Sequence, residues 1–81
     1  MNLVELTEFL VKSVIKDEDS VSVKEFESEE DYIDIRVLAS EEEMGAIIGR
    51  SGNTINAIRT IVQASAYANN LKHVKINVES F

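Results

Sequence analysis

The sequence predicts an α+β fold in which three helices cover one face of a three-stranded mixed sheet. Two long segments carry apolar residues at steps of three and four, as amphipathic helices do, and three short segments alternate apolar with polar residues, as strands do. Two of the three glycines, Gly49 and Gly52, divide a further apolar stretch into a short helix and the start of a long one. The predicted order is therefore α-β-β-α-α-β.

The first helix is expected at about residues 3–16. Its apolar stripe has helical spacing and consists of Leu3, Leu6, Leu10 and Val14. Asn2 is suited to cap the first turn, because an asparagine side chain accepts hydrogen bonds from the free amides there. The acidic run at residues 17–20 ends the helix.

The first strand is expected at residues 20–27, where valines alternate with polar residues. Phe26 is one position out of phase, which suggests a bulge or a strand end near Lys24 and Glu25. The polar residues 28–31 then form a turn, so this strand should pair antiparallel with the next one.

The second strand is expected at residues 32–38, with one apolar face made of Ile33, Ile35 and Val37. After it, Ser40 and Glu43 have the spacing of a capping box, in which the Ser40 hydroxyl accepts from the Glu43 amide and the Glu43 carboxylate reaches back. A short helix begins there. Its three adjacent glutamates fit the positive end of a helix dipole better than an acid–base pair or a metal site.

The long helix is expected from Asn53 to about Asn69, and its buried stripe consists of Ile55, Ile58, Val62 and Ala66. The last strand is expected at residues 73–79. Two helices separate it from the strand at residues 32–38, so it can lie parallel to that strand on its free edge. The strand at residues 32–38 is then the central one.

Length and composition limit the functions that the chain can have. A chain of 81 residues builds one domain, residues 1–81, with a modest core and no deep enzymatic cleft. It has no cysteine, no apolar run long enough to cross a membrane and no secretory leader, which fits a cytoplasmic protein without membrane attachment. His73 is the single histidine, so no metal site, cofactor or nucleophilic catalysis is expected.

Charge is distributed unevenly along the chain. Residues 1–43 hold 14 acids and 4 bases, a net charge of −10, whereas residues 44–81 hold 1 acid and 4 bases, a net charge of +3. An anionic ligand is therefore expected near the bases of the second half, which are Arg50, Arg59, Lys72 and Lys75.

The segment Gly49-Arg50-Ser51-Gly52 is the candidate site. Its glycines permit backbone angles closed to other residues and carry no Cβ that would hold a ligand away. The first amides of the following helix are free, so an anion is the natural occupant, with Arg50 and Ser51 as further donors. Such a site holds phosphate and sugar without reading base identity. The alternative is that the glycines only form a tight turn between two helices.

The run Ile48-Gly49-Arg50-Ser51-Gly52, followed by Ile55 and Ile58, resembles the signature of K-homology (KH) domains, in which a GxxG loop clamps single-stranded nucleic acid. With its element order, the chain from about Leu3 to Val78 is similar to a type II KH domain. It also resembles the small stand-alone bacterial KH-domain RNA-binding proteins of the KhpA (YlqC) type. The resemblance implies single-stranded RNA as ligand, a homodimer, a heterodimer with a larger Jag-type multidomain KH protein, and post-transcriptional regulation linked to cell elongation, shape and division.

The residues that the resemblance places on RNA are Gly49, Arg50, Ser51, Gly52, Ile48, Ile55, Arg59 and Arg36. The first four form the clamp, the two isoleucines the groove wall beside it, and Arg59 lies further along the same helix. Arg36 could face the bases across the groove, although its position in the pleat fits outward solvation equally well. Few bases surround the loop, so binding should be weak, with about two to four phosphates neutralised.

Two functions are compatible with these observations. The first is a non-catalytic RNA-binding module, and the second is a protein-interaction or dimerisation module that uses the same apolar groove with little RNA binding. The aromatic residues have spacings that suit core and edge positions, with no paired platform for base stacking; they are Phe9, Phe26, Tyr32, Tyr67 and Phe81.

Overall fold

The computed structural model describes residues 2–26, 28 and 30–81, and these contain the predicted helices and strands in the predicted order. The elements are α1 (Leu3–Lys12), β1 (Val21–Phe26), β2 (Tyr32–Ala39), α2 (Glu41–Ile48), α3 (Asn53–Ala68) and β3 (His73–Ser80). Short 3₁₀ turns at Glu18–Ser20 and Arg50–Gly52 precede β1 and α3. Glu27, at the predicted end of the first strand, Glu29 of the predicted turn, and Met1 lie outside the described residues.

The sheet has β2 at its centre, as predicted. It pairs antiparallel with β1 and parallel with β3. Val23 lies opposite Val37, and Ile35 lies opposite Ile76, so apolar residues of all three strands share one face.

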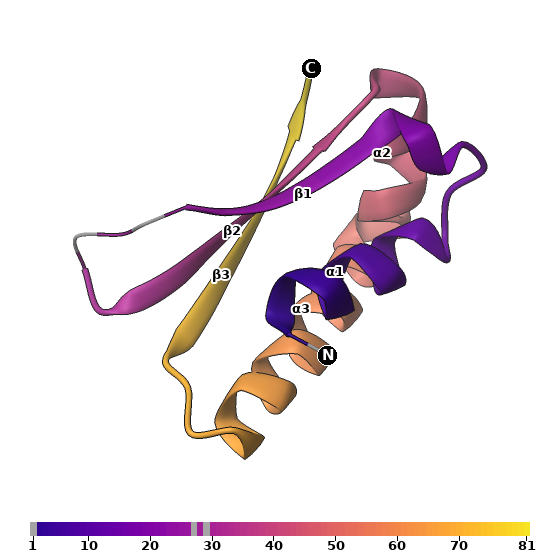
Figure 1. Cartoon of the computed structure of the whole chain (residues 1–81). Helices are drawn as coiled ribbons and strands as arrows, with labels where there is room; N and C mark the ends of the chain where they lie inside the picture. The colour runs from indigo at the N-terminus through magenta and orange to yellow at the C-terminus, as the bar shows by residue number, and fades with distance from the viewer. Residues whose placement is uncertain (1, 27, 29) are drawn as a thin grey trace.

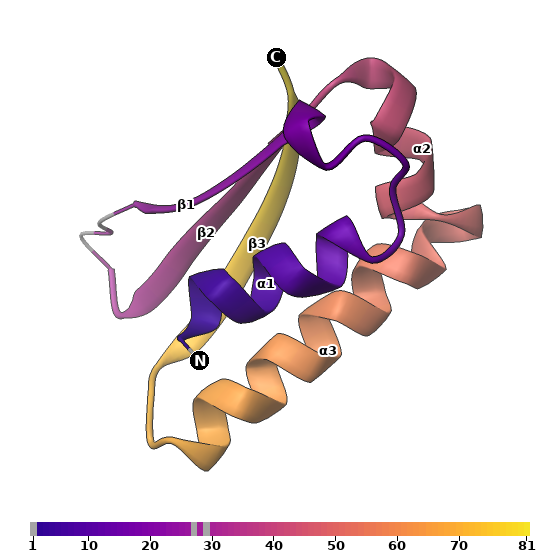
Figure 2. The same cartoon turned by 45° about the vertical axis from the view of Figure 1, so that its right-hand side comes forward.

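All three helices lie on that apolar face, and the other face of the sheet is left without a covering helix (Figures 1 and 2). The core between the two layers contains the predicted stripe of α3, which is Ile55, Ile58, Val62 and Ala66. The predicted fold class, an α+β domain with a mixed three-stranded sheet covered on one face, is confirmed.

The first helix is shorter than predicted, because it ends at Lys12 rather than near residue 16. Ser13 ends it: its amide donates to the Phe9 carbonyl at 3.1 Å, and its hydroxyl donates to the Leu10 carbonyl at 2.6 Å. The next amide, of Val14, donates to the Val11 carbonyl at 3.1 Å. The predicted cap is confirmed, since Asn2 Oδ1 accepts from the Glu5 amide at 2.7 Å.

The predicted stripe of this helix was also partly wrong. The fully buried line is Leu3, Thr7 and Val11, whereas Leu6 and Leu10 are half-buried. Val14, the predicted end of the stripe, is exposed. Thr7 is tolerated in the core because its hydroxyl donates to the Leu3 carbonyl at 2.7 Å, which leaves only its methyl group to pack.

The capping box predicted at the start of α2 is wrong. Ser40 makes no side-chain cap, and its backbone carbonyl instead accepts from the Glu43 amide at 3.0 Å. The Glu43 carboxylate accepts from the amide of Lys16 at 3.3 Å. It therefore ties the segment after α1 to α2, a contact between residues far apart in the sequence.

Of the bulge or strand end predicted near Lys24 and Glu25, the bulge is wrong, because β1 pairs with β2 in an unbroken register; the strand ends at Phe26, one residue after Glu25. Phe26 belongs to the uncovered face of the sheet, where the guanidinium carbon of Arg36 lies 4.4 Å from the centre of its ring. None of the aromatic residues of the described chain belongs to the buried core, contrary to the expected core positions, and Phe9, Tyr67 and Phe81 are strongly exposed.

Candidate functional site

The loop between α2 and α3 reverses the chain with an unusual backbone. The φ angles of Gly49, Ser51 and Gly52 are 77°, 55° and 78°, all in the region that glycine favours. The Gly49 amide donates to the Gly45 carbonyl at 2.9 Å and ends α2, and the Gly52 amide donates to the Gly49 carbonyl at 3.2 Å. The loop is thus a defined turn rather than a continued helix.

Gly49 is required by the packing of the turn as well as by its φ angle. A Cβ atom there would lie 2.6 Å from the Cβ and 2.9 Å from the amide nitrogen of Thr54, closer than real side chains approach. At Gly52 an added Cβ would have only an ordinary contact of 3.6 Å with Asn56 Nδ2, so the φ angle is the main constraint there. The two glycines therefore have different roles.

The apex of the loop presents two adjacent amides. Among the described residues, no protein group accepts a hydrogen bond from the amide of Arg50 or of Ser51. Both residues are exposed. Successive free N–H groups in a turn next to a helix N-terminus form a concavity that binds anions.

The two arginines near this loop differ in their contacts with the rest of the protein. Arg50 forms no ion pair within the described part of the chain. Arg59, by contrast, donates to the Ile76 carbonyl from Nε at 3.2 Å and from Nη2 at 3.0 Å, and to Asn56 Oδ1 at 3.0 Å. Only the Arg50 guanidinium is thus free of protein partners, whereas Arg59 joins α3 to the edge strand β3.

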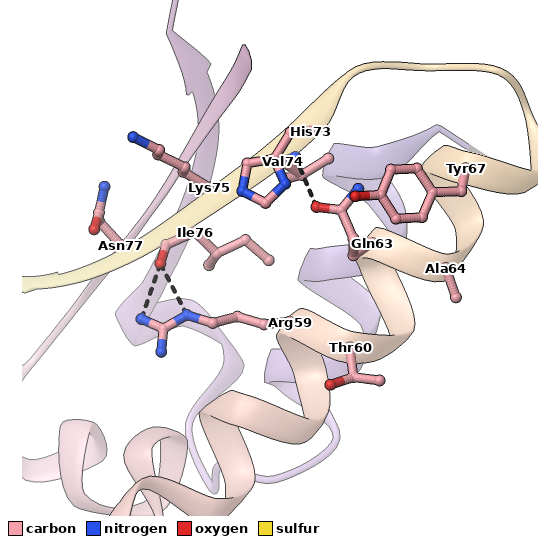
Figure 3. A pocket seen from close by; sticks show the side chains of 10 residues that line it. All are labelled: Arg59, Thr60, Gln63, Ala64, Tyr67, His73, Val74, Lys75, Ile76 and Asn77. Atoms are coloured by element: carbon pink, nitrogen blue, oxygen red, sulfur yellow. Dashed lines mark hydrogen bonds between the residues drawn. The ribbon is translucent and has the colours of Figure 1, made fainter.

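A groove of about 670 Å³ runs between α3 and β3 (Figure 3). Val74 and Ile76 form its apolar floor, and Gln63 lines its side, where its Oε1 accepts from the Val74 amide at 2.9 Å. Tyr67 stands at one end, 61% exposed, and Arg59 lies towards the other. The groove follows α3 away from the loop.

The structure brings most of the predicted site residues together, but not all of them. Ile48, 37% exposed, lies at the end of α2 directly before the loop. Ile55 is only 4% exposed and belongs to the core, so it supports the loop from beneath and offers little surface to a ligand. Arg36 points to the uncovered face of the sheet and does not share a surface with the loop.

Sequence reasoning missed two residues of the groove, Gln63 and Tyr67. Together with Arg59 they recur at steps of four along α3, which places them on one side of the helix. This spacing was the available signal in the sequence.

No group of three or more His, Cys, Asp or Glu side chains in the described residues could hold a metal ion. No helix among them is both long and apolar enough to span a bilayer.

Comparison with known proteins gives a consistent picture. A family model described as "KhpA/KhpB, KH domain" matches residues 4–78. The RNA-binding protein KhpA of Borreliella burgdorferi is 41% identical over 69 residues, which is 85% of this chain and 83% of that protein. The RNA-binding protein KhpA of Clostridium perfringens is 40% identical over 70 residues, 86% of this chain and 92% of that protein.

Solved structures show the same fold at low sequence identity. A crystal structure of Aquifex aeolicus Era has a TM-score of 0.72 at 16% identity and covers 96% of this chain. A structure of Era in complex with MgGDPNP and part of 16S ribosomal RNA has a TM-score of 0.72 at 14% identity and covers 98%. This chain spans only 29% and 30% of those two chains.

Proposed function

The chain belongs to the KhpA/KhpB family of KH domains, and from this membership we propose that residues 1–81 form a single non-catalytic RNA-binding domain of the bacterial cytoplasm. The loop Gly49–Gly52 clamps the phosphate backbone of a single strand, and the groove between α3 and β3 receives its bases. The names of the relatives support RNA as the ligand, and the geometry of the loop supports the clamp.

The observation that carries the clamp is the pair of exposed amides at Arg50 and Ser51, which have no acceptor among the described residues. A phosphate oxygen is a strong acceptor and can satisfy both. Because Gly52 has no side chain, the sugar–phosphate backbone can approach the turn closely, whereas the missing side chain of Gly49 lets the turn pack against Thr54. The guanidinium of Arg50 then lies in reach of a neighbouring phosphate.

The groove suits unstacked bases rather than a duplex. Its floor of Val74 and Ile76 is apolar, and Tyr67 offers an exposed ring at one end. Single-stranded bases are commonly held by stacking on such rings and by contacts with apolar surface. Ile48, at the other side of the loop, extends the apolar rim.

Binding by this site should be weak and should depend only moderately on salt. Arg50 is its one cation without a protein partner among the described residues, and the whole chain carries a net charge of −7. With about two to four phosphates neutralised, the logarithm of affinity should fall against the logarithm of salt with a slope of about −1.5 to −3.

The direct test is the double substitution Arg50→Asp with Ser51→Asp. Two carboxylates at the apex repel phosphate, and aspartate tolerates the left-handed backbone of position 51. Fluorescence anisotropy with labelled single-stranded RNA should show an affinity at least about tenfold lower, with unchanged circular dichroism and melting temperature. Lys16→Asp with Ser13→Asp is the matched control, because it makes the same change of charge at exposed positions away from the loop. An RNA affinity unaltered by the loop pair would contradict the clamp.

A second candidate function, protein interaction, is favoured by an exposed apolar stripe on α3. The stripe recurs at steps of three and four and consists of Ala57, Ile61, Ala64 and Ala68. Three alanines allow another helix to approach closely around Ile61, which is 47% exposed. The resemblance implies a homodimer and a heterodimer with a Jag-type KH protein, with a role in cell elongation and division, and this stripe is a suitable contact for either.

Ile61→Glu tests the interaction. It should shift sedimentation toward the monomer, because a carboxylate would be buried without a partner in the paired state. Phe9→Glu is the control, since Phe9 is also exposed but lies on α1. Equal sedimentation of the wild type and the Ile61 variant, both monomeric at the concentrations where RNA binds, would exclude α3 pairing as a requirement for function.

A further inference from the structure

A second surface of the molecule combines cations with aromatic rings. The open face of the sheet is defined here as the side chains of β1, β2 and β3 that point away from the helices. This face includes Lys24, Phe26, Tyr32, Asp34, Arg36 and Lys75. Figure 3 shows Lys75 pointing away from α3, at the edge of the groove, which it also lines.

The open face has an unusual charge for this protein. It carries three of the 8 bases of the chain, Lys24, Arg36 and Lys75, but only two of the 15 acids, Asp34 and Glu79. The register brings the bases together, since Lys24 lies opposite Arg36 on β2. In a chain with a net charge of −7, this is a local excess of positive charge, complementary to an anionic ligand.

Each of two aromatic rings on this face is paired with a cation. The guanidinium carbon of Arg36 lies 4.4 Å from the centre of the Phe26 ring, and Lys75 Nζ lies 4.2 Å from the centre of the Tyr32 ring. Arg36 Nη2 also donates to Asp34 Oδ2 at 3.2 Å. The Arg36 guanidinium is thus held by a ring and a carboxylate while its side chain stays 40% exposed, and an exposed guanidinium plane is a surface on which bases stack.

Asp34 fixes the position of the exposed Arg36 guanidinium on this face. The residue is only 6% exposed, and its Oδ1 has no hydrogen-bond partner among the described residues. Lys75 lies directly opposite on β3, but its ammonium lies over Tyr32. Because Oδ1 is covered by protein atoms, a ligand cannot reach it, and Asp34 acts on this face through Oδ2, which holds the Arg36 guanidinium.

We propose that the open face is a second binding surface for single-stranded RNA. A base stacks on Arg36, and phosphates contact Lys24 and Lys75. The combination of a cationic track and a flat stacking group is how single strands are held without strong sequence preference. The proposal takes its ligand class from the proposed function of the loop, but the loop and the open face share no residue, so either assignment can fail alone. Lys75 also lines the groove, whereas Lys24 and Arg36 do not.

The test compares two pairs of lysine substitutions in anisotropy titrations with a single-stranded RNA long enough to reach both surfaces, about 16 nucleotides. Lys24→Gln with Lys75→Gln should weaken binding about tenfold and reduce the steepness of the salt dependence by about 1.4, because two phosphate contacts are lost. Lys12→Gln with Lys16→Gln removes the same charge from the helix side and should leave the affinity within about twofold. Circular dichroism checks that all variants are folded.

A second measurement does not depend on removing charge. The Nε–Hε resonance of Arg36 should shift when the RNA is added, and Arg36→Lys, which keeps the charge but loses the flat guanidinium, should weaken binding at least threefold, as loss of a stacking contact does. An Arg36 that only stabilised the sheet would show neither effect.

Two results would overturn the proposal: equal weakening by both lysine pairs, or no weakening by the Lys24 and Lys75 pair. If that pair left the RNA affinity unchanged but altered sedimentation, the face would be assigned to a protein contact. The loop variant keeps the two proposals separate. If Arg50→Asp with Ser51→Asp has no effect while the Lys24 and Lys75 pair does, the clamp fails and the open face stands. The reverse result overturns the open face alone.

Discussion

The loop Gly49–Gly52 and the open face of the sheet present donors to an anion in different ways. The loop uses the main chain, since its apex amides are free and its two glycines allow the tight turn that exposes them. The open face uses side chains from three strands, held by cation–ring contacts and by the carboxylate of Asp34. The loop therefore depends on four consecutive residues, and the open face depends on strand register.

This difference predicts how each surface responds to substitution. In a backbone site an added Cβ costs stability, whereas a change of an exposed side chain such as that of Arg50 alters the charge offered to the ligand and leaves the fold intact. A side-chain site shows the opposite behaviour, with small effects on stability and larger effects on binding. The following substitutions test the comparison by their effect on the free energy of unfolding.

The largest effect is expected for Gly49→Ala. The new Cβ would collide with the Thr54 backbone at a φ of 77°, so the loop must rearrange. We expect a loss of about 2–3 kcal/mol in urea unfolding. Gly45→Ala is the control, because nothing lies within 4 Å of the added Cβ inside α2, and it should stabilise by about 0.5–1 kcal/mol. Equal stability of the Gly49 variant and the wild type would show that the turn is not rigid.

Arg59→Met and Arg50→Met compare the contribution to stability of a hydrogen-bonded arginine with that of an arginine without protein partners among the described residues. The first substitution removes two hydrogen bonds to the Ile76 carbonyl, and we expect it to lower the free energy of unfolding by about 1–2 kcal/mol. Arg50→Met removes no contact within the described residues and should change it by less than about 0.5 kcal/mol. Similar losses for both would mean that Arg50 also has a structural partner.

Gly52→Ala should have a smaller effect than Gly49→Ala. Its added Cβ has room, 3.6 Å from Asn56 Nδ2, so only the left-handed φ of 78° opposes it. A loss of about 1 kcal/mol is expected in the same urea experiment. If the Gly52 variant were the less stable of the two, contact with Thr54 would not be the dominant constraint in the loop.

Phe26→Leu should have the smallest effect on stability. It removes the ring beneath Arg36 but keeps an apolar side chain on a half-exposed position, so about 0.5 kcal/mol is expected. The effect should disappear in a variant that already carries Arg36→Met, as a double-mutant cycle can measure. A loss of the same size in both backgrounds would mean that the ring and the guanidinium do not interact.

Features that depend on neighbouring residues could be predicted from the sequence. The stripe of α3 follows from its spacing, and the loop follows from two glycines three residues apart between apolar turns. The stripe of α1 was misassigned because the Thr7 hydroxyl donates to a carbonyl of its own helix, so that Thr7 packs as an apolar residue. A pattern that counts only apolar residue types does not include such a threonine.

Features that depend on distant residues could not be predicted in this way. The Glu43 carboxylate does not cap its own helix but accepts a hydrogen bond from the Lys16 amide. The side chains of Arg59 and Gln63 form hydrogen bonds with the backbone of β3. The open face requires the register of β1, β2 and β3 together, because Asp34 meets Lys75 only after two helices have crossed over. Phe26 is out of phase with the valines of β1 because its side chain belongs to the open face and theirs belong to the core.

The central claim is that the free amides at the apex of the loop bind phosphate. The most direct test is a titration of ¹⁵N-labelled protein with a short single-stranded RNA, about four nucleotides long so that it spans the loop alone. We predict that the amide signals of Arg50 and Ser51 shift most, and that added salt reverses the shifts. Saturable binding of this RNA with both amide signals unmoved would contradict the claim.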